Sequence, residues 1–272
     1  MVLRIGRIPF LVCAPFFHDF LGKETKYPSY SFVEGPPSAL VSLLRVGEIH
    51  LAPASSIGYA LTPEKFVLAP DLCTSCKLEV RSVKLFSHYP FEQLSSRRVH
   101  LTTQSRTSVA LVQILAELRY QVRPEFVSSV PFDSTFDARL LIGDEALLED
   151  VAGTFEFSYD LASLWLDWQG LPFVFGAWSI HRSALTSEYR SELDAFLDDV
   201  TLSVTHFKED RKASLTKWLS YYPVALPEKI MENYYNVIDY SFTDDRKLSL
   251  SLFFSLCYKM GFIPQNPQLV FL

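Results

Sequence analysis

Glycine is scarce in this sequence, which has 10 glycines among 272 residues. Neither the G-x-G-x-x-G fingerprint nor the G-x-x-x-x-G-K-[ST] phosphate loop occurs in it. The G-x-S-x-G elbow of hydrolases and the H-E-x-x-H helix of zinc proteases are also missing. The six histidines are scattered, so their spacing indicates no metal cluster. These absences argue against a nucleotide phosphate loop and against the commonest hydrolase and zinc sites.

Basic residues form no block, and Arg97-Arg98 is only a pair. The net charge is −6 and the pI is about 5.5. Nucleic acid is therefore not an expected partner, because binding it depends on clustered positive charge. A small anion is still compatible with an acidic chain, since single helix ends or arginines can hold it.

Cysteine is also rare: the four are Cys13, Cys73, Cys76 and Cys257. The spacing of Cys73 and Cys76 is that of a redox pair or half a zinc site. No further ligands lie nearby, and the pair does not open a helix after a strand, so we predict an ordinary loop. Unpatterned cysteines fit a reducing cytosol best.

No apolar run approaches the ~18 residues that a membrane span needs. Arg4 and Arg7 precede an apolar segment at residues 8–17 that mimics a signal peptide. Two prolines interrupt this segment, and no small-residue cleavage site follows before His18. We therefore predict the first strand and loop of the mature fold, in a cytoplasmic protein without a membrane partner.

What the chain does have is apolar content, with 49% hydrophobic and 14% aromatic residues. Strand patterns alternate with helix patterns through the first two-thirds, which predicts an α/β architecture with parallel sheets. Strands are expected at 3–8, 30–34, 49–52, 66–69, 83–87, 99–101, 126–127, 140–142 and 171–180. Helices are expected at 38–46, 57–61, 109–118, 146–148, 189–207, 212–221, 227–234 and 248–260, and residues 159–168 suggest a loop and a helical turn.

One local arrangement recurs: a strand, a polar loop and the start of a helix. Ser55-Ser56 follow one strand, Thr102 to Ser108 follow another, and Asp144 stands at a third. Helix N-termini carry unpaired N–H groups and the positive end of the dipole, which suits a small carboxylated ligand. The simpler alternative is that Ser105 or Thr107 only caps its helix.

Several segments together match one known family: Arg4 to Leu11, Pro37-Ser38, Ala52 to Ala60, Ser82 to Ser87, Leu101 to Val109, Leu141 to Leu147 and Gly170 to Trp178. Their order and spacing resemble the chorismate dehydratases of the futalosine route to menaquinone. The resemblance is dense over residues 3–182 and loose in the C-terminal helices.

The resemblance implies an α/β fold like that of type II periplasmic binding proteins, with two lobes and a ligand cleft between them. Lobe one would contain residues 1–88 and 177–272, and lobe two residues 89–176. The two crossovers would lie near Phe86-Ser87 and between Phe175 and Trp178. The oligomeric state, monomer or homodimer, is left open.

The resemblance also implies an activity, the dehydration of chorismate to 3-[(1-carboxyvinyl)oxy]benzoate, without a metal or organic cofactor. The small-molecule dicarboxylate needs two anion sites. The residues that would supply them are Ser55 and Ser56 in one lobe and Thr103, Ser105, Thr107 and Ser108 in the other. Ser82 would hold the enolpyruvyl carboxylate, and Asp144 would either orient a hydroxyl or cap its helix.

One position departs from the family pattern. The family's usual Ile-Pro-Tyr-Leu-Asn reads Ile8-Pro9-Phe10-Leu11-Val12 here. Val12 thus stands where the resemblance implies an asparagine that assists proton removal. Losing a hydrogen bond to a charged group costs about 1.5–3 kcal/mol, whereas losing a general base costs about 10²–10⁴ in rate. Three alternatives follow: a dehydratase, a dicarboxylate-binding protein with little turnover, or a lyase acting on a related carboxylate.

Overall fold

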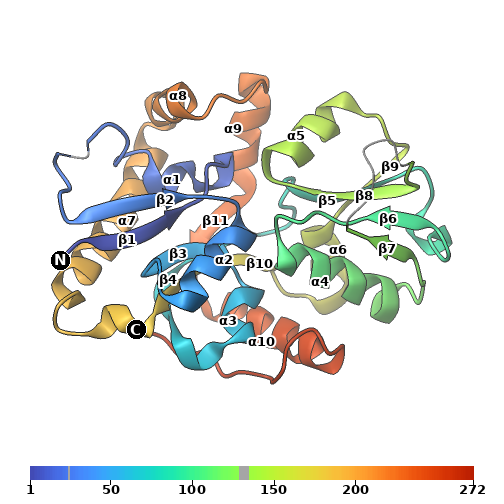
Figure 1. Cartoon of the computed structure of the whole chain (residues 1–272). Coiled ribbons are helices and arrows are strands. Elements are labelled where there is room, and N and C mark those ends of the chain that lie inside the picture. The colour runs from blue at the N-terminus through green and yellow to red at the C-terminus, as the bar shows by residue number, and fades with distance from the viewer. Residues whose placement is uncertain (24, 129–134) are drawn as a thin grey trace.

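Two β-sheets divide the chain into two lobes that lie side by side (Figure 1). The computed structural model describes residues 1–23, 25–128 and 135–272. The predicted α/β architecture with two lobes is confirmed. Aromatic residues fill much of the interior, and Trp165, Trp178 and Trp218 are fully buried.

The first sheet has six strands in the order β11-β4-β10-β3-β1-β2. Their bounds are β1 Leu3–Arg7, β2 Tyr30–Glu34, β3 Leu51–Ser55, β4 Phe66–Cys76, β10 Val174–His181 and β11 Ile238–Ser241. Every residue of β3 is buried, as is typical of a central strand covered on both faces. The second sheet has the order β7-β6-β8-β5-β9. Its strands are β5 Val83–Ser87, β6 Arg98–His100, β7 Glu125–Val127, β8 Ala138–Ile142 and β9 Phe157–Asp160.

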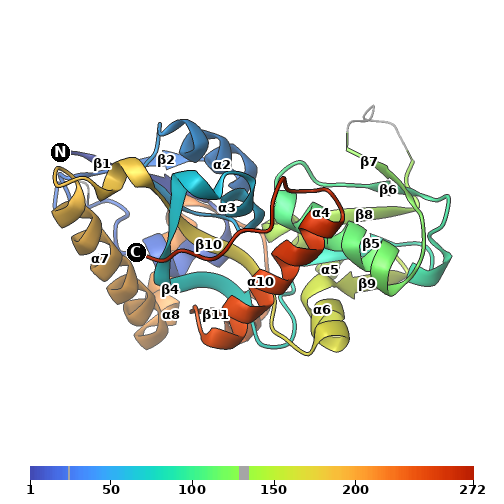
Figure 2. The same ribbon diagram turned by 90° about the horizontal axis from the view of Figure 1, so that it is seen from below.

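Helices cover both sheets. Their bounds are α1 Ala14–Phe17, α2 Pro37–Val46, α3 Ile57–Leu61, α4 Arg106–Ile114, α5 Gly143–Ala152, α6 Leu161–Gln169, α7 Arg190–Glu209, α8 Arg211–Tyr221, α9 Glu228–Val237 and α10 Asp244–Lys259. Helix α10 packs against β10 of the first lobe and against α4 of the second (Figure 2). None of the helices in the described ranges is long and apolar enough to cross a membrane.

The sheets are mixed rather than parallel, which corrects the sequence-based expectation. Strand β5 runs antiparallel to β8 and β9, and β10 runs antiparallel to β3 and β4. The chain enters β5 and β10 directly from the other lobe. Each of the two strands therefore runs opposite to the strands beside it. The parallel pairs are β1 with β2 and β3 in the first sheet, and β6 with β7 and β8 in the second.

The crossovers between the lobes lie earlier than expected. Strand β5 pairs within the second sheet, and β10 pairs within the first. The chain therefore passes between the sheets at residues 77–82 and again at residues 170–173. We propose a lobe one of residues 1–76 and 174–272 and a lobe two of residues 83–169, in place of boundaries at 88 and 176.

Three local expectations were wrong. Cys73 and Cys76 lie buried in strand β4, not in a loop, and β4 continues seven residues past its expected end at Ala69. Residues 159–168 form the end of β9 and most of α6, because Asp160 caps that helix through Ala162 and Ser163. Strand β11 was not expected at all, and it adds to the sheet by pairing with β4.

Candidate functional site

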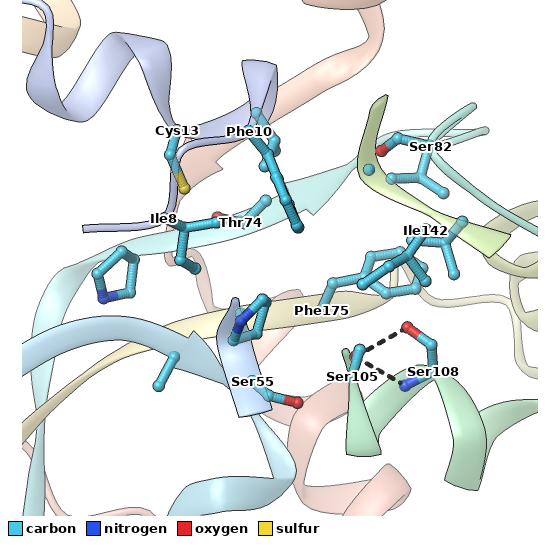
Figure 3. Close-up of a pocket in the computed structure, with 18 residues that line it drawn as sticks. Ile8, Phe10, Cys13, Ser55, Thr74, Ser82, Ser105, Ser108, Ile142 and Phe175 are labelled. Carbon is cyan, nitrogen blue, oxygen red and sulfur yellow. Dashed lines mark hydrogen bonds between the residues drawn. The ribbon is translucent and has the colours of Figure 1, made fainter. Parts of the chain in front are cut away.

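A cavity lies between the lobes, with about 550 Å³ of space not filled by atoms, counting the part that opens to solvent. Apolar side chains form much of its wall, among them Ile8, Phe10, Val12, Ile142 and Phe175. Figure 3 shows Phe10 and Cys13 on one side and Ser55, Ser105 and Ser108 on the opposite side. Its position between the lobes matches the predicted cleft.

The polar groups of the cavity wall are mostly hydroxyls. They belong to Ser55, Thr74, Ser82, Ser105 and Ser108. None of the described residues that line the cavity has an acidic, basic or imidazole side chain. Cys13 adds a thiol, and burial together with the charge of Asp144 raises its pKa, so the thiol stays protonated. An anionic ligand here would therefore have to be held by uncharged donors such as these hydroxyls.

Ser105 is the N-cap of α4, as the simpler alternative predicted. Its Oγ accepts hydrogen bonds from the Ser108 N–H at 3.3 Å and from the Ser108 hydroxyl at 3.0 Å (Figure 3). Both side chains also line the cavity. Capping and cavity lining are thus combined in the same two residues.

Thr107 contacts the other lobe instead of the cavity. Its Oγ1 lies 2.7 Å from the Ser55 Oγ and accepts a hydrogen bond from the Ile57 N–H at 3.0 Å. The Thr107 N–H in turn donates to the Ser55 Oγ at 3.1 Å. Each lobe therefore supplies a hydroxyl to the first turn of a helix in the other lobe. The two loops that were predicted to bind carboxylates are hydrogen-bonded to each other here. Each loop supplies the acceptor for an N–H group in the first helical turn of the other lobe.

Two further expected residues lie away from the cavity. Ser56 is fully buried, and its hydroxyl donates to the Val174 carbonyl at 3.0 Å. Thr103, together with Arg106, lines a neighbouring pocket, which shares Ser105 with the cavity. Of the residues expected to bind substrate, the cavity thus brings together Ser55, Ser82, Ser105 and Ser108. The strand-loop-helix pattern located the loops correctly but could not say which side chain of each loop points inward.

Asp144 also joins the lobes. Its Oδ1 accepts a hydrogen bond from the Leu11 N–H at 3.0 Å. The N-cap position of α5 belongs to Ile142, so Asp144 does not cap its own helix, and it is not among the cavity-lining residues. Burial raises the pKa of Asp144 to about 6 from an ordinary 3.8, and the Leu11 N–H opposes this rise.

Asp144→Asn is expected to change how stability depends on pH. Because the folded pKa of Asp144 lies above its unfolded value, the carboxyl favours the folded state below about pH 4 and loses this contribution as pH rises through about 6. The melting temperature of the wild type minus that of Asp144→Asn should therefore be about 2–4 °C larger at pH 5 than at pH 7. This is the shift that about 1 kcal/mol produces in a domain of ordinary size. Thermal scans of both proteins at the two pH values measure it. A constant difference would contradict the raised pKa.

The first loop carries Val12 into the cavity wall. Its neighbour Phe10 packs on Gly143 of the second lobe, where φ is +63° and an added Cβ would lie 2.9 Å from the Phe10 Cδ2. Glycine is required at this position because only it combines a left-handed backbone with so close a ring. Sequence reasoning missed this pair, although the Gly143-Asp144 step at a helix start was a usable signal.

Sequence reasoning also missed three tyrosines of α9 and β11. The Tyr234 hydroxyl lies 2.9 Å from the Ser82 Oγ, and Tyr235 and Tyr240 donate to the carbonyls of Leu11 and Val12 at 2.7 and 2.9 Å. The clustering of three tyrosines within residues 234–240 was the available signal. Within the described part of the chain, His, Cys, Asp and Glu form no group of three or more that could hold a metal ion.

The fold and its cavity define a two-lobed protein of the periplasmic-binding-protein type. Protein AF1704 from Archaeoglobus fulgidus is similar, with a TM-score of 0.69, 17% identity and coverage of 96% of this chain and 98% of that one. The periplasmic aliphatic sulphonate binding protein SsuA from Escherichia coli has a TM-score of 0.69, 14% identity and coverage of 97% and 89%. At such identities the likeness shows the fold alone.

Sequence comparison gives the family. A family model described as menaquinone biosynthesis matches residues 3–259, and the chain belongs to that family. The chain is also 34% identical over 186 residues to the chorismate dehydratase of Thermus thermophilus. That match covers 61% of this chain and 65% of the relative, which is less than two-thirds of the relative's length.

Proposed function

We propose that this protein removes water from chorismate to form 3-[(1-carboxyvinyl)oxy]benzoate in menaquinone biosynthesis by the futalosine route. Membership of the menaquinone biosynthesis family and similarity to a chorismate dehydratase support this proposal. The single structural observation that carries it is the interlobe cavity, whose apolar walls suit a ring and whose hydroxyls suit carboxylates.

In the proposed reaction a ring C–H bond breaks, its electron pair enters the ring, and the hydroxyl leaves. The hydroxide takes up a proton and departs as water, and the ring becomes aromatic. Ser105 and Ser108 lie at the start of α4 in the second lobe, and Ser55 lies at the end of β3 in the first lobe. All three line the cavity, and their hydroxyls would hold one carboxylate. Ser82, on the other side, would hold the second.

The proton needs a base, and the described cavity wall offers no carboxylate or imidazole for this role. The Cys13 thiol is excluded as a base because burial keeps it protonated. We propose that a carboxylate of the substrate takes the proton, with Val12 at the position where the family resemblance implies a hydrogen-bonding asparagine. The apolar walls favour this step, because a poorly solvated carboxylate is a stronger base than one in water.

Val12→Asn is expected to raise kcat by about tenfold or more, the worth of one hydrogen bond to a charged group. The assay mixes purified protein with chorismate and follows the loss of cyclohexadiene absorbance and the appearance of the benzoate product. Val12→Leu is the matched control, since leucine has the same number and branching of side-chain heavy atoms as asparagine without its amide, and it should bring no gain.

Two outcomes would contradict this account. Chorismate binding without turnover in both the wild type and Val12→Asn would leave a dicarboxylate-binding protein in place of a dehydratase. Equal rates for Val12→Asn and Val12→Leu would show that the missing amide does not limit the reaction.

A further inference from the structure

The back of the cavity is built by tyrosines from the C-terminal part of the chain. Tyr234, Tyr235 and Tyr240 are exposed by 0%, 7% and 6%. Each hydroxyl contacts a segment that forms the cavity: residue Ser82 at the crossover, and the carbonyls of Leu11 and Val12 in the first loop. This arrangement places hydroxyl groups behind the cavity wall without exposing them to the ligand.

The contact between Tyr234 and Ser82 has a preferred direction. Both hydroxyls are buried and 2.9 Å apart, and either could donate. A phenol, with an ordinary pKa near 10, is a much stronger acid than an aliphatic alcohol and hence the better donor. When Tyr234 donates, the Ser82 oxygen is used as an acceptor and its own proton is free to point elsewhere.

The cavity is the place where that proton is needed. The Ser82 side chain lines the cavity, and among the described residues its hydroxyl has no hydrogen-bond partner besides Tyr234. An ionised carboxylate only accepts hydrogen bonds, and the described cavity wall has no cation to meet it. Each hydroxyl that is fixed as a donor therefore contributes directly to ligand affinity.

We propose that Tyr234 is a positioning residue, which fixes the Ser82 hydroxyl as a hydrogen-bond donor to a carboxylate of the substrate. The inference rests on the proposed function. Burial raises the pKa of Tyr234 well above its ordinary value, so the phenol keeps its proton throughout the physiological range. The backbone of Ser82 is fixed as well, because its carbonyl accepts from the Gly143 N–H at 2.7 Å. The serine thus has both its main chain and its hydroxyl oriented.

The test is a double-mutant cycle with chorismate as the probe. Tyr234→Phe keeps the ring and removes only the hydroxyl. We expect it to raise KM and the Kd for chorismate about fivefold to tenfold with kcat changed little, because a contact made equally in ground and transition states affects binding alone. Ser82→Ala should raise both constants at least as much. The double variant should equal Ser82→Ala, since Tyr234 acts only through Ser82.

Tyr59→Phe is the matched control for loss of stability. Tyr59 is 1% exposed, and its hydroxyl donates to the Gln268 carbonyl and accepts from the Val270 N–H, away from the cavity. This variant should melt at a lower temperature with an unchanged KM. A similar rise in KM in Tyr59→Phe would assign the effect of Tyr234→Phe to general loosening and overturn the inference.

The outcomes separate the inference from the proposed function. A wild type that binds or converts chorismate, combined with unchanged KM and Kd in Tyr234→Phe, overturns the positioning role alone. Additive effects of Tyr234→Phe and Ser82→Ala also overturn it. A wild type that neither binds nor converts chorismate overturns the proposed function and the inference together.

Discussion

Gly143→Ala is expected to lower the free energy of unfolding by about 2–4 kcal/mol and to reduce kcat/KM by about tenfold or more. The residue has φ at +63°, where an L side chain is strained. The new Cβ would also lie 2.9 Å from the Phe10 Cδ2, so the ring must move. Because Phe10 lines the cavity, its displacement changes the shape of the site.

Gly153 provides a matched control at the other end of the same helix. It has the same φ of +63°, and nothing lies within 4 Å of the Cβ that alanine would add. Gly153→Ala should therefore lose only the stability that a strained left-handed backbone costs, about 1–2 kcal/mol, and keep its kcat/KM. Urea unfolding gives the stabilities, and the chorismate assay gives the rates. Equal losses of stability and of kcat/KM in the two variants would contradict the role of Phe10. In the Gly143→Ala background, Phe10→Leu should restore part of the lost stability.

Trp165→Ala is expected to cost about 3–5 kcal/mol of stability, the usual range for removing a buried tryptophan. Trp165 is fully buried in α6 of the second lobe. Its ring packs edge-on against Phe173 and Phe253, at centroid distances of 5.2 and 6.2 Å, and its Nε1–H donates to the Ser249 hydroxyl at 3.0 Å. Because Phe253 and Ser249 belong to α10, this side chain attaches α6 to a helix of the first lobe.

Two further variants test how much of this loss comes from the buried ring. Trp165→Phe keeps an aromatic ring and should lose much less than Trp165→Ala. Trp168→Ala removes a half-buried tryptophan from the same helix and should cost clearly less than Trp165→Ala, because less apolar surface becomes exposed. Urea titrations, fitted with a common slope of free energy against urea concentration, give the three free energies of unfolding. A Trp165→Ala loss no larger than that of Trp168→Ala would contradict the proposed attachment.

Local periodicity was sufficient to predict most of the helices and strands, whereas the two-lobed fold was inferred from the family resemblance. The expected strand at 30–34 coincides with β2, and the helix predicted to end at Gly47 does so, with that glycine in the left-handed conformation. Such features depend on neighbours in the sequence. The antiparallel direction of β5 and β10 depends on which lobe the chain has just left, and the strand patterns alone carry no such information.

The site was predicted less completely, for the same physical reason. A hydroxyl at a helix start can be inferred from the sequence, and Ser105 has this role. The partner of Thr107, however, is Ser55, which is 52 residues away in the other lobe. Asp144 pairs with Leu11 across 133 residues, and Tyr234 with Ser82 across 152. These contacts exist only once two lobes have formed, so neither spacing nor periodicity reveals them.

The order of strands in the first sheet has a consequence for synthesis on the ribosome. Strand β4 is complete early, yet one neighbour, β10, follows the whole second lobe, and the other, β11, is later still. The Cys73 thiol, for example, donates to the carbonyl of Ser241, 168 residues away. Strand β4 must therefore wait with both edges unpaired while about 100 residues are translated, which takes about 5–20 s at the usual elongation rate. The second lobe has its strands within one continuous stretch and is free to fold first, so we expect the first lobe to be the one that needs a chaperone.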